Sequence, residues 1–283
     1  MIEKNVVLIE TLDNIGTGVL YPCIYKGKEV VKDKNAGNSY ILITNHHVLG
    51  YPSKENIQKS ISLTFYDDWG TRIVQNDICT IKLFELKDNE NQVEEDELVK
   101  WDRTRDIVAL LIVLKRGIQL TLSTGVLFEE LKNREKIYVE GYPGVLSEQE
   151  VSQRIQLEGM QKAIFPSNDK VGAYQITDDY HWYNNLEDRD LLEGLSGSPV
   201  FMKRDGKEFL LGINQSIANV DDGKNPFKIV YFLRVEHILN YLRGKNCIIY
   251  RKISENKIRI EWIYEENKVY ENDITILLSL IHI

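Results

Sequence analysis

The stretch Glu193-Gly194-Leu195-Ser196-Gly197-Ser198-Pro199-Val200 places one serine between two glycines and leads into an apolar run. A serine hydroxyl that attacks a carbonyl must be exposed at a tight turn, with backbone N–H groups facing the oxyanion that develops. Gly194 and Gly197 permit such a turn, because glycine adopts backbone conformations that other residues avoid. A Gly/Ser cluster before a proline is also typical of an ordinary loop. The interpretation of Ser196 as a nucleophile therefore depends on a base and an orienting acid elsewhere in the chain.

Candidate base and acid side chains stand beside two apolar runs upstream of this serine. The run 40–44 continues into Asn45, His46 and His47, and so delivers an imidazole at the end of a buried strand, where a general base belongs. Asp106 directly precedes the apolar run 107–113, so its carboxylate can lie half-buried against an imidazole. The order His, Asp, Ser along the chain is that of chymotrypsin, and it differs from the order in subtilisins and α/β-hydrolases.

These motifs resemble those of the trypsin-like (chymotrypsin-fold) serine peptidases, especially their bacterial, disulfide-poor branch. Residues 44–48, Thr-Asn-His-His-Val, are similar to the family's histidine motif, with His47 in the catalytic place. Residues 106–110, Asp-Ile-Val-Ala-Leu, resemble the aspartate motif, and residues 194–199 resemble the serine motif. The resemblance covers roughly residues 5 to 243, with supporting segments at 16–20, 141–144 and 211–213.

The resemblance implies acyl transfer to a serine in two steps. His47 would take the proton of Ser196 during its attack on a peptide carbonyl, and Asp106 would fix the imidazole tautomer. The backbone N–H groups of Gly194 and Ser196 would form the oxyanion hole. His46 would be structural, because its neighbour occupies the catalytic place. The implied function is that of a serine endopeptidase with a protein or peptide substrate and no cofactor or metal.

Substrate-binding residues are also carried over from the resemblance. Asp190 stands where peptidases that cleave after Lys or Arg carry an acid, although Arg189 could neutralise it, so a Lys/Arg preference stays open. Asn214, Gln215 and Ser216, on the strand after the serine, would pair with the substrate backbone. Leu195 stands where digestive enzymes have an acid that captures a new N-terminus, so activation by N-terminal cleavage is not expected.

The hydrophobic pattern predicts an all-β fold. Short apolar runs bounded by turn-forming segments are typical of strands, and an apolar stripe at helical spacing over 234–243 predicts a helix that ends at Gly244. Together with the resemblance, this predicts two six-stranded antiparallel β-barrels (chymotrypsin-like), a C-terminal helix and an extra β-hairpin or short meander. The expected strands are 6–9, 18–21, 40–44, 61–66, 78–86, 107–114, 137–140, 173–177, 199–202, 209–213 and 229–233.

Three units are expected along the chain. Residues 1–120 would form the N-terminal barrel with His47 and Asp106, and residues 121–244 would form the C-terminal barrel with Ser196 and the closing helix. Residues 245–283 would be a β-rich extension. The last five residues, Ser-Leu-Ile-His-Ile, look like translated sequencing-adapter readthrough, which predicts that this extension is the start of a truncated further domain.

The composition limits which binding partners and which cellular compartment are expected. The 283 residues are 43% hydrophobic and 28% charged, which suits a compact protein of one to two domains. The formal net charge of -8 argues against a basic nucleic-acid surface, and the apolar run 6–9 is too short for a signal peptide or membrane anchor. Three scattered cysteines predict neither a disulfide framework nor a zinc site, which favours a cytoplasmic location.

Three functional hypotheses follow from these residues. The first is an active serine endopeptidase. The second is a catalytically silent trypsin-fold module that binds or scaffolds. The third, which is compatible with the first, is a peptidase that serves as the effector of a larger bacterial signalling or defence protein with a C-terminal sensor domain or partner.

Overall fold

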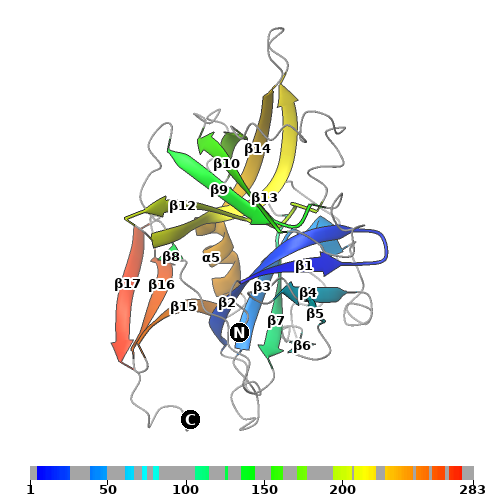
Figure 1. Cartoon of the computed structure of the whole chain (residues 1–283). Coiled ribbons are helices and arrows are strands. Elements are labelled where there is room, and N and C mark those ends of the chain that lie inside the picture. The colour runs from blue at the N-terminus through cyan, green and yellow to red at the C-terminus, as the bar shows by residue number, and fades with distance from the viewer. Residues whose placement is uncertain are drawn as a thin grey trace.

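The chain is described by a computed structural model that covers residues 5–25, 39–49, 61–66, 72–74, 79–82, 106–114, 125–126, 135–143, 154–161, 171–176, 194–205, 207–220, 227–244, 247–254, 257–264 and 268–275. These residues form two β-sheets with one α-helix between them (Figure 1). None of the helices formed by these residues is long and apolar enough to cross a membrane.

The first sheet contains seven strands from the N-terminal part of the chain, in the order β5-β4-β1-β2-β3-β7-β6. Their pairings are all antiparallel. The strands are β1 (Val6–Glu10), β2 (Ile15–Tyr25), β3 (Ser39–Thr44), β4 (Ser62–Tyr66), β5 (Arg72–Val74), β6 (Cys79–Lys82) and β7 (Val108–Leu114).

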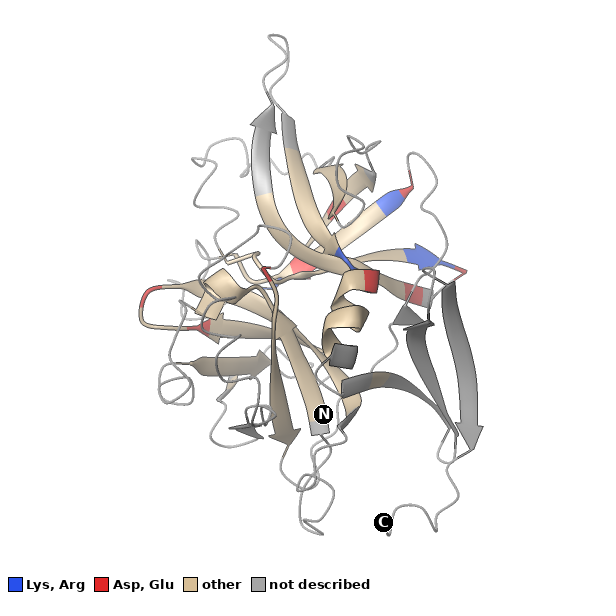
Figure 2. Ribbon diagram, turned by 180° about the vertical axis from the view of Figure 1, so that it is seen from behind, with Lys and Arg blue, Asp and Glu red and all other residues tan. Residues whose placement is uncertain are grey.

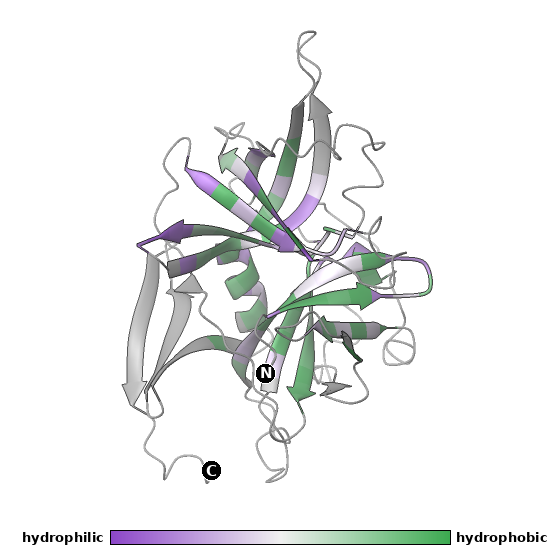
Figure 3. Cartoon of the chain, viewed as in Figure 1, coloured by the Kyte–Doolittle hydropathy of each residue, from purple (hydrophilic) through white to green (hydrophobic). Residues whose placement is uncertain are grey.

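The sequence of strand β7 is almost continuously apolar because both of its faces are buried. Leu110 and Ile112 pack inside the first barrel, whereas Ala109 and Leu111 face the opposite side, against the second sheet and the helix. Successive side chains of a strand point to opposite faces, so a strand that is buried on both faces needs apolar residues throughout. Figure 3 shows this hydrophobic character along β7 and the neighbouring β3.

The second sheet closes into a six-stranded barrel. Its order is β12-β9-β10-β11-β14-β13, and a further pairing between β12 and β13 joins the two ends; the short β8 adds to β13 in parallel. The strands are β8 (Gly125–Val126), β9 (Lys136–Gly141), β10 (Ile155–Gln161), β11 (Val171–Ile176), β12 (Pro199–Arg204), β13 (Lys207–Val220) and β14 (Phe227–Arg234).

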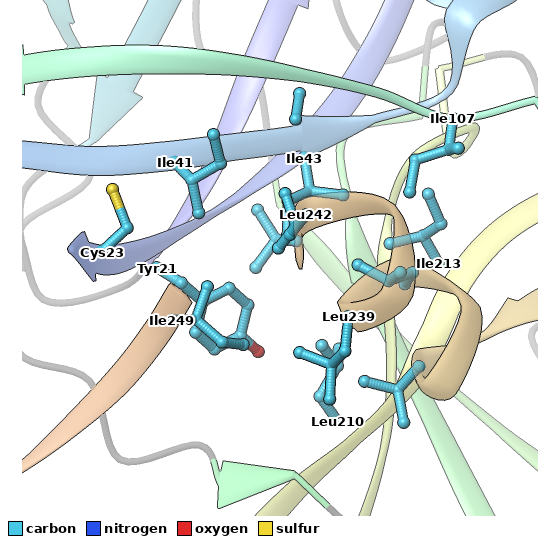
Figure 4. Close-up of a cluster of buried hydrophobic side chains, with 14 of the residues drawn as sticks. Tyr21, Cys23, Ile41, Ile43, Ile107, Leu210, Ile213, Leu239, Leu242 and Ile249 are labelled. Atoms are coloured by element: carbon cyan, nitrogen blue, oxygen red, sulfur yellow. The ribbon is translucent and has the colours of Figure 1, made fainter. Parts of the chain in front are cut away.

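The two sheets and the helix share one hydrophobic core. Helix α5 (Val235–Gly244) contributes Ile238, Leu239 and Leu242, which pack with residues of both sheets such as Ile43 and Ile213 (Figure 4). Charged residues of the described chain lie mostly at strand ends and in turns, away from this core (Figure 2). The packing of α5 therefore fixes the two barrels side by side, and this arrangement positions the residues between them.

The chain after α5 adds three strands to the first sheet. They are β15 (Cys247–Ser254), β16 (Lys257–Tyr264) and β17 (Lys268–Thr275). Strand β15 pairs with the end of β2, in the register Cys247↔Tyr25 to Ile249↔Cys23, which extends the sheet to ten strands. Ile249 is buried in the core shared by the barrels and α5.

The all-β fold class, the chymotrypsin-like arrangement and the C-terminal helix are confirmed; the second sheet closes into the predicted barrel, and the described strands of the first sheet form a half-barrel. The extension is a short meander of three strands, the second of the two alternatives, because β16 pairs on both of its edges. Strands β5, β8 and β10 were not expected, and β2 and β13 are longer than the apolar runs that predicted them. The boundaries of the three predicted units stay predictions.

Candidate active site

The segment that carries the predicted nucleophile is a turn that leads into β12. We call residues 194–198 the serine loop. Gly194 has a φ of 90° and Gly197 a φ of 82°, which lie in the region that favours glycine. A Cβ at Gly197 would lie 2.1 Å from the carbonyl oxygen of Thr17, so the space there also requires glycine. Ser196 between them is partly exposed, as a nucleophile must be.

His47 lies in a short 3-10 helix, η1 (His46–Leu49), directly after β3. The strand ends because Asn45 turns away from the ladder and donates a hydrogen bond from Nδ2 to the carbonyl oxygen of Asp106, at 2.8 Å. Asn14, in the β1–β2 turn, donates from Nδ2 to the carbonyl oxygen of His47, at 3.3 Å. The backbone around the imidazole is thus held from both sides.

Asp106 pairs with His47 through both carboxylate oxygens. His47 Nδ1 lies 2.5 Å from Asp106 Oδ2, and the backbone N–H of His47 donates to Asp106 Oδ1 at 3.1 Å. The Asp106 side chain is only 5% exposed, whereas that of His47 is 35% exposed. The engagement of Nδ1 leaves Nε2 as the nitrogen that can exchange a proton with a substrate or a nucleophile.

Two consecutive residues of β2 bring the histidine and the serine segments together. A Cβ at Gly16 would lie 2.3 Å from Val48 Cγ1, so η1 packs directly on Gly16. The next residue, Thr17, donates its backbone N–H to the carbonyl oxygen of Ser196 at 2.9 Å. The hydrogen bonds of the described residues join His47 to Asp106 but not to Ser196. A bond between base and nucleophile often tightens only when substrate binds.

The direction of one predicted oxyanion donor follows from the hydrogen bonds of the serine loop. The carbonyl oxygen of Leu195 accepts bonds from the Ser198 N–H and from Asn214 Nδ2, both at 3.1 Å. In a trans peptide group the N–H points opposite to the C=O. The Ser196 N–H therefore points away from these two donors. The N–H of Gly194 belongs to the peptide group that begins at residue 193, which lies outside the described residues.

The predicted substrate-binding residues are described in part. Gln215 is mostly buried and Ser216 is exposed, and both lie on β13 beside the serine loop. The register with β14 shifts between Asn214 and Ser216, so Gln215 is the extra residue of a β-bulge. Bulges are frequent beside active sites, because they change the direction of a side chain. Asp190 lies outside the described residues, so its predicted role in specificity stays a prediction.

His46 is the half-buried neighbour of the candidate pair. Burial lowers its pKa below the ordinary 6.5, and this effect outweighs the negative charge of Asp106, which raises it; His47 lowers it further. His46 is therefore more readily neutral than a free histidine. No cluster of three or more His, Cys, Asp or Glu side chains that could hold a metal ion occurs in the part of the chain that the structure describes.

Sequence reasoning did not identify the buried polar residues that hold these segments. Thr17 was included only in the supporting segment 16–20, without a role of its own, yet its hydroxyl donates to the carbonyl oxygen of Gly194 at 2.7 Å. Asn214 was noted only among substrate-contacting residues, yet its amide bonds to Leu195. For Thr17 the available signal was a polar side chain within a mostly apolar run, since buried polar groups need partners. Asn214 gave no such signal, because Gln215 and Ser216 follow it directly on β13.

No family model matches the sequence, and no curated protein matches it either. Among solved structures, the active form of the Rv3671c protease from M. tuberculosis is similar over 89% of this chain and 85% of that chain, with 16% identity and a TM-score of 0.44. The structure of Deg5 is similar over 86% of this chain and 91% of that chain, with 16% identity and a TM-score of 0.47.

The topology described above is the basis for assigning the fold. A closed six-stranded barrel packs beside a second antiparallel sheet and a C-terminal helix. His47 and Asp106 come from the first sheet, Ser196 comes from the second, and the segments that carry them meet at β2. The described residues have a chymotrypsin-like fold.

Proposed function

We propose that the protein is a serine endopeptidase that cleaves peptide bonds through a covalent acyl-enzyme. The observation that carries the proposal is the pair of hydrogen bonds from His47 to the buried carboxylate of Asp106, beside a partly exposed serine in a glycine turn. A carboxylate in this position keeps the imidazole in the tautomer whose Nε2 accepts a proton, and it stabilises the imidazolium that forms.

In the proposed first step, Ser196 Oγ attacks the carbonyl carbon of the scissile peptide while His47 Nε2 takes its proton. The negative charge that develops on the carbonyl oxygen is stabilised by the N–H groups of Ser196 and Gly194. His47 then gives the proton to the leaving amine, and the C–N bond breaks. Water, deprotonated by His47, hydrolyses the acyl-enzyme and regenerates Ser196.

A preference for Lys or Arg before the scissile bond belongs to the same proposal, with Asp190 as the acid that pairs with the basic side chain. The proposal also includes a role as the effector of a larger protein. Leu195 supports control by something other than N-terminal cleavage, because its buried apolar side chain offers no acid to capture a new terminal amine. Control would then come from a sensor domain or partner.

The proposal is tested by incubating the whole chain with a diverse peptide library and identifying new termini by mass spectrometry. Cleavage by the wild type, and none by Ser196→Ala or His47→Ala, is the expected result. Enrichment of Lys or Arg before the cut should disappear in Asp190→Asn. Identical peptide patterns for wild type and Ser196→Ala would instead indicate a catalytically silent module.

A further inference from the structure

Thr17 and Asn214 are buried polar side chains that bond to the serine loop from opposite sides. Thr17 lies on β2 of the first sheet and is 0% exposed, and Asn214 lies on β13 of the second barrel and is 2% exposed. Their side chains donate to two consecutive carbonyl groups of the loop, those of Gly194 and Leu195. A polar side chain buried this completely needs a hydrogen-bond partner, so packing alone does not account for either residue.

The partners of the Thr17 hydroxyl decide which hydrogen bond it donates and which it accepts. The backbone N–H of Tyr142 donates to Thr17 Oγ1 at 3.0 Å, so the hydroxyl proton must point elsewhere. The hydroxyl donates this proton to Gly194 O at 2.7 Å, because a carbonyl oxygen can only accept. Tyr142 is itself held in place, since its ring packs with Val6 and Leu8 of β1. Thr17 therefore connects the serine loop to the first sheet, on which it lies, and through Tyr142 to the second barrel.

The polarity of the Asn214 bonds is fixed in the same way. The Tyr174 hydroxyl lies 3.3 Å from Asn214 Oδ1, which leaves Nδ2 to donate to Leu195 O at 3.1 Å. The backbone of Asn214 also bonds to both Gly197 and Ser198. Asn214 thus holds the C=O of the peptide group whose N–H belongs to Ser196.

The glycines of the loop make such bonds necessary. A segment that contains two glycines at positive φ has more accessible backbone conformations than other segments, and one rotated peptide group would turn its N–H away from the oxyanion. We propose that Thr17 and Asn214 are positioning residues that keep the serine loop in the orientation in which the Ser196 N–H faces the oxyanion. This inference rests on the proposed peptidase function.

The test is the rate at which a fluorophosphonate probe labels Ser196, followed by intact mass between about pH 5 and pH 9, a range that spans histidine titration. Thr17→Val keeps the shape of the side chain but removes the hydroxyl, and Asn214→Asp replaces the donating nitrogen with oxygen. We expect each to slow labelling by about ten- to a hundredfold, less than the roughly 100- to 1,000-fold cost of removing an oxyanion donor. Thr17→Ser should restore the rate to within about threefold of wild type, because it restores the hydroxyl.

A matched control separates this role from general effects of the substitutions. Thr64→Val removes a buried threonine hydroxyl of β4, away from the serine loop. It should label close to the wild-type rate. The pH midpoint of labelling, which reports the protonation of His47, should be the same in all variants, since neither Thr17 nor Asn214 bonds to the His47–Asp106 pair among the described residues.

The outcomes separate this inference from the proposed function. A wild type that is never labelled would contradict both. A labelled wild type with equally fast Thr17→Val and Asn214→Asp would overturn the inference alone, as would a Thr17→Ser variant no faster than Thr17→Val. A shifted pH midpoint would also overturn it, by placing the effect on His47. If Thr17→Val lacks a cooperative thermal unfolding transition, Asn214→Asp and Thr17→Ser decide the question.

Discussion

At the scale of single residues, Asp106 has the surroundings that a carboxylate needs to orient an imidazole. It is almost fully buried and accepts two bonds from His47, one from the backbone and one from the ring. The sequence predicted this pairing from the position of Asp106 before an apolar strand. The bond from Asn45 to the Asp106 backbone was not predicted, because no motif or periodicity marks a side-chain amide that bonds to a distant main-chain carbonyl.

Asp106→Asn should slow peptide cleavage by about 10⁴-fold, because an amide can donate to Nδ1 and so favours the wrong imidazole tautomer. The measurement is the cleavage rate of a peptide from the library, together with the thermal unfolding temperature. Asp13→Asn, which changes an exposed aspartate in the β1–β2 turn, serves as the control and should cleave at the wild-type rate. Equal rates for Asp106→Asn and wild type would contradict the assignment of Asp106.

His46 should make the free energy of unfolding depend on pH. Its pKa in the folded protein is lower than the ordinary 6.5, so the unfolded chain binds this proton more readily. The contribution of His46 to stability is therefore fully present above about pH 6.5 and decreases as the pH falls below it. Urea unfolding at a series of pH values should show a shallower decrease for His46→Asn than for wild type. Parallel curves for the two proteins would contradict this prediction.

At the scale of elements, continuous apolar runs predicted strands well. Strands β3 and β7 were predicted almost to their ends, because both faces of each are buried and the pattern is unambiguous. Strand β10 was not predicted, because Leu157 is its one large apolar residue in the core and Gly159 replaces the next. Strand β2 was predicted too short, because Pro22 interrupts the apolar run. In the structure the strand continues through Pro22, which pairs with Tyr40 of β3.

Helix α5 should contribute strongly to stability through its buried face. Ile238 is fully buried between the barrels, so Ile238→Ala should lower the free energy of unfolding by about 2–5 kcal/mol. Asn240→Ala changes an exposed residue of the same helix and should stay within roughly 0.5 kcal/mol of wild type. Urea unfolding of both variants measures the difference. Similar values for the two would mean that the helix does not join the barrels as described.

At the scale of the whole molecule, the meeting of the two barrels was predicted only through resemblance. The residues that form the junction are far apart in the chain; Thr17 and Gly194 are separated by 177 positions. Apolar periodicity reports which residues are buried but not which buried residues meet. The same limit applies to the extension after α5, because nothing in its sequence indicates that β15 pairs with β2.

The pairing of β15 with β2 predicts that the extension stabilises the first sheet. Ile249 is buried in the core that the barrels share with α5, so Ile249→Ala should lower the free energy of unfolding by about 2–5 kcal/mol. Leu12→Ala, at an exposed apolar residue of the β1–β2 turn, serves as the control and should have little effect. An unchanged stability of Ile249→Ala in urea unfolding would contradict the packing of β15 on this core.

The most direct test of the central claim, that Ser196 is a nucleophile activated by His47, is labelling with a fluorophosphonate probe read by intact mass. The probe requires an activated serine but no knowledge of the substrate. The account predicts one adduct on the wild type, located on Ser196 by peptide mapping, and none on Ser196→Ala or His47→Ala. A folded wild type that gains no adduct, or equal labelling of wild type and Ser196→Ala, would contradict it.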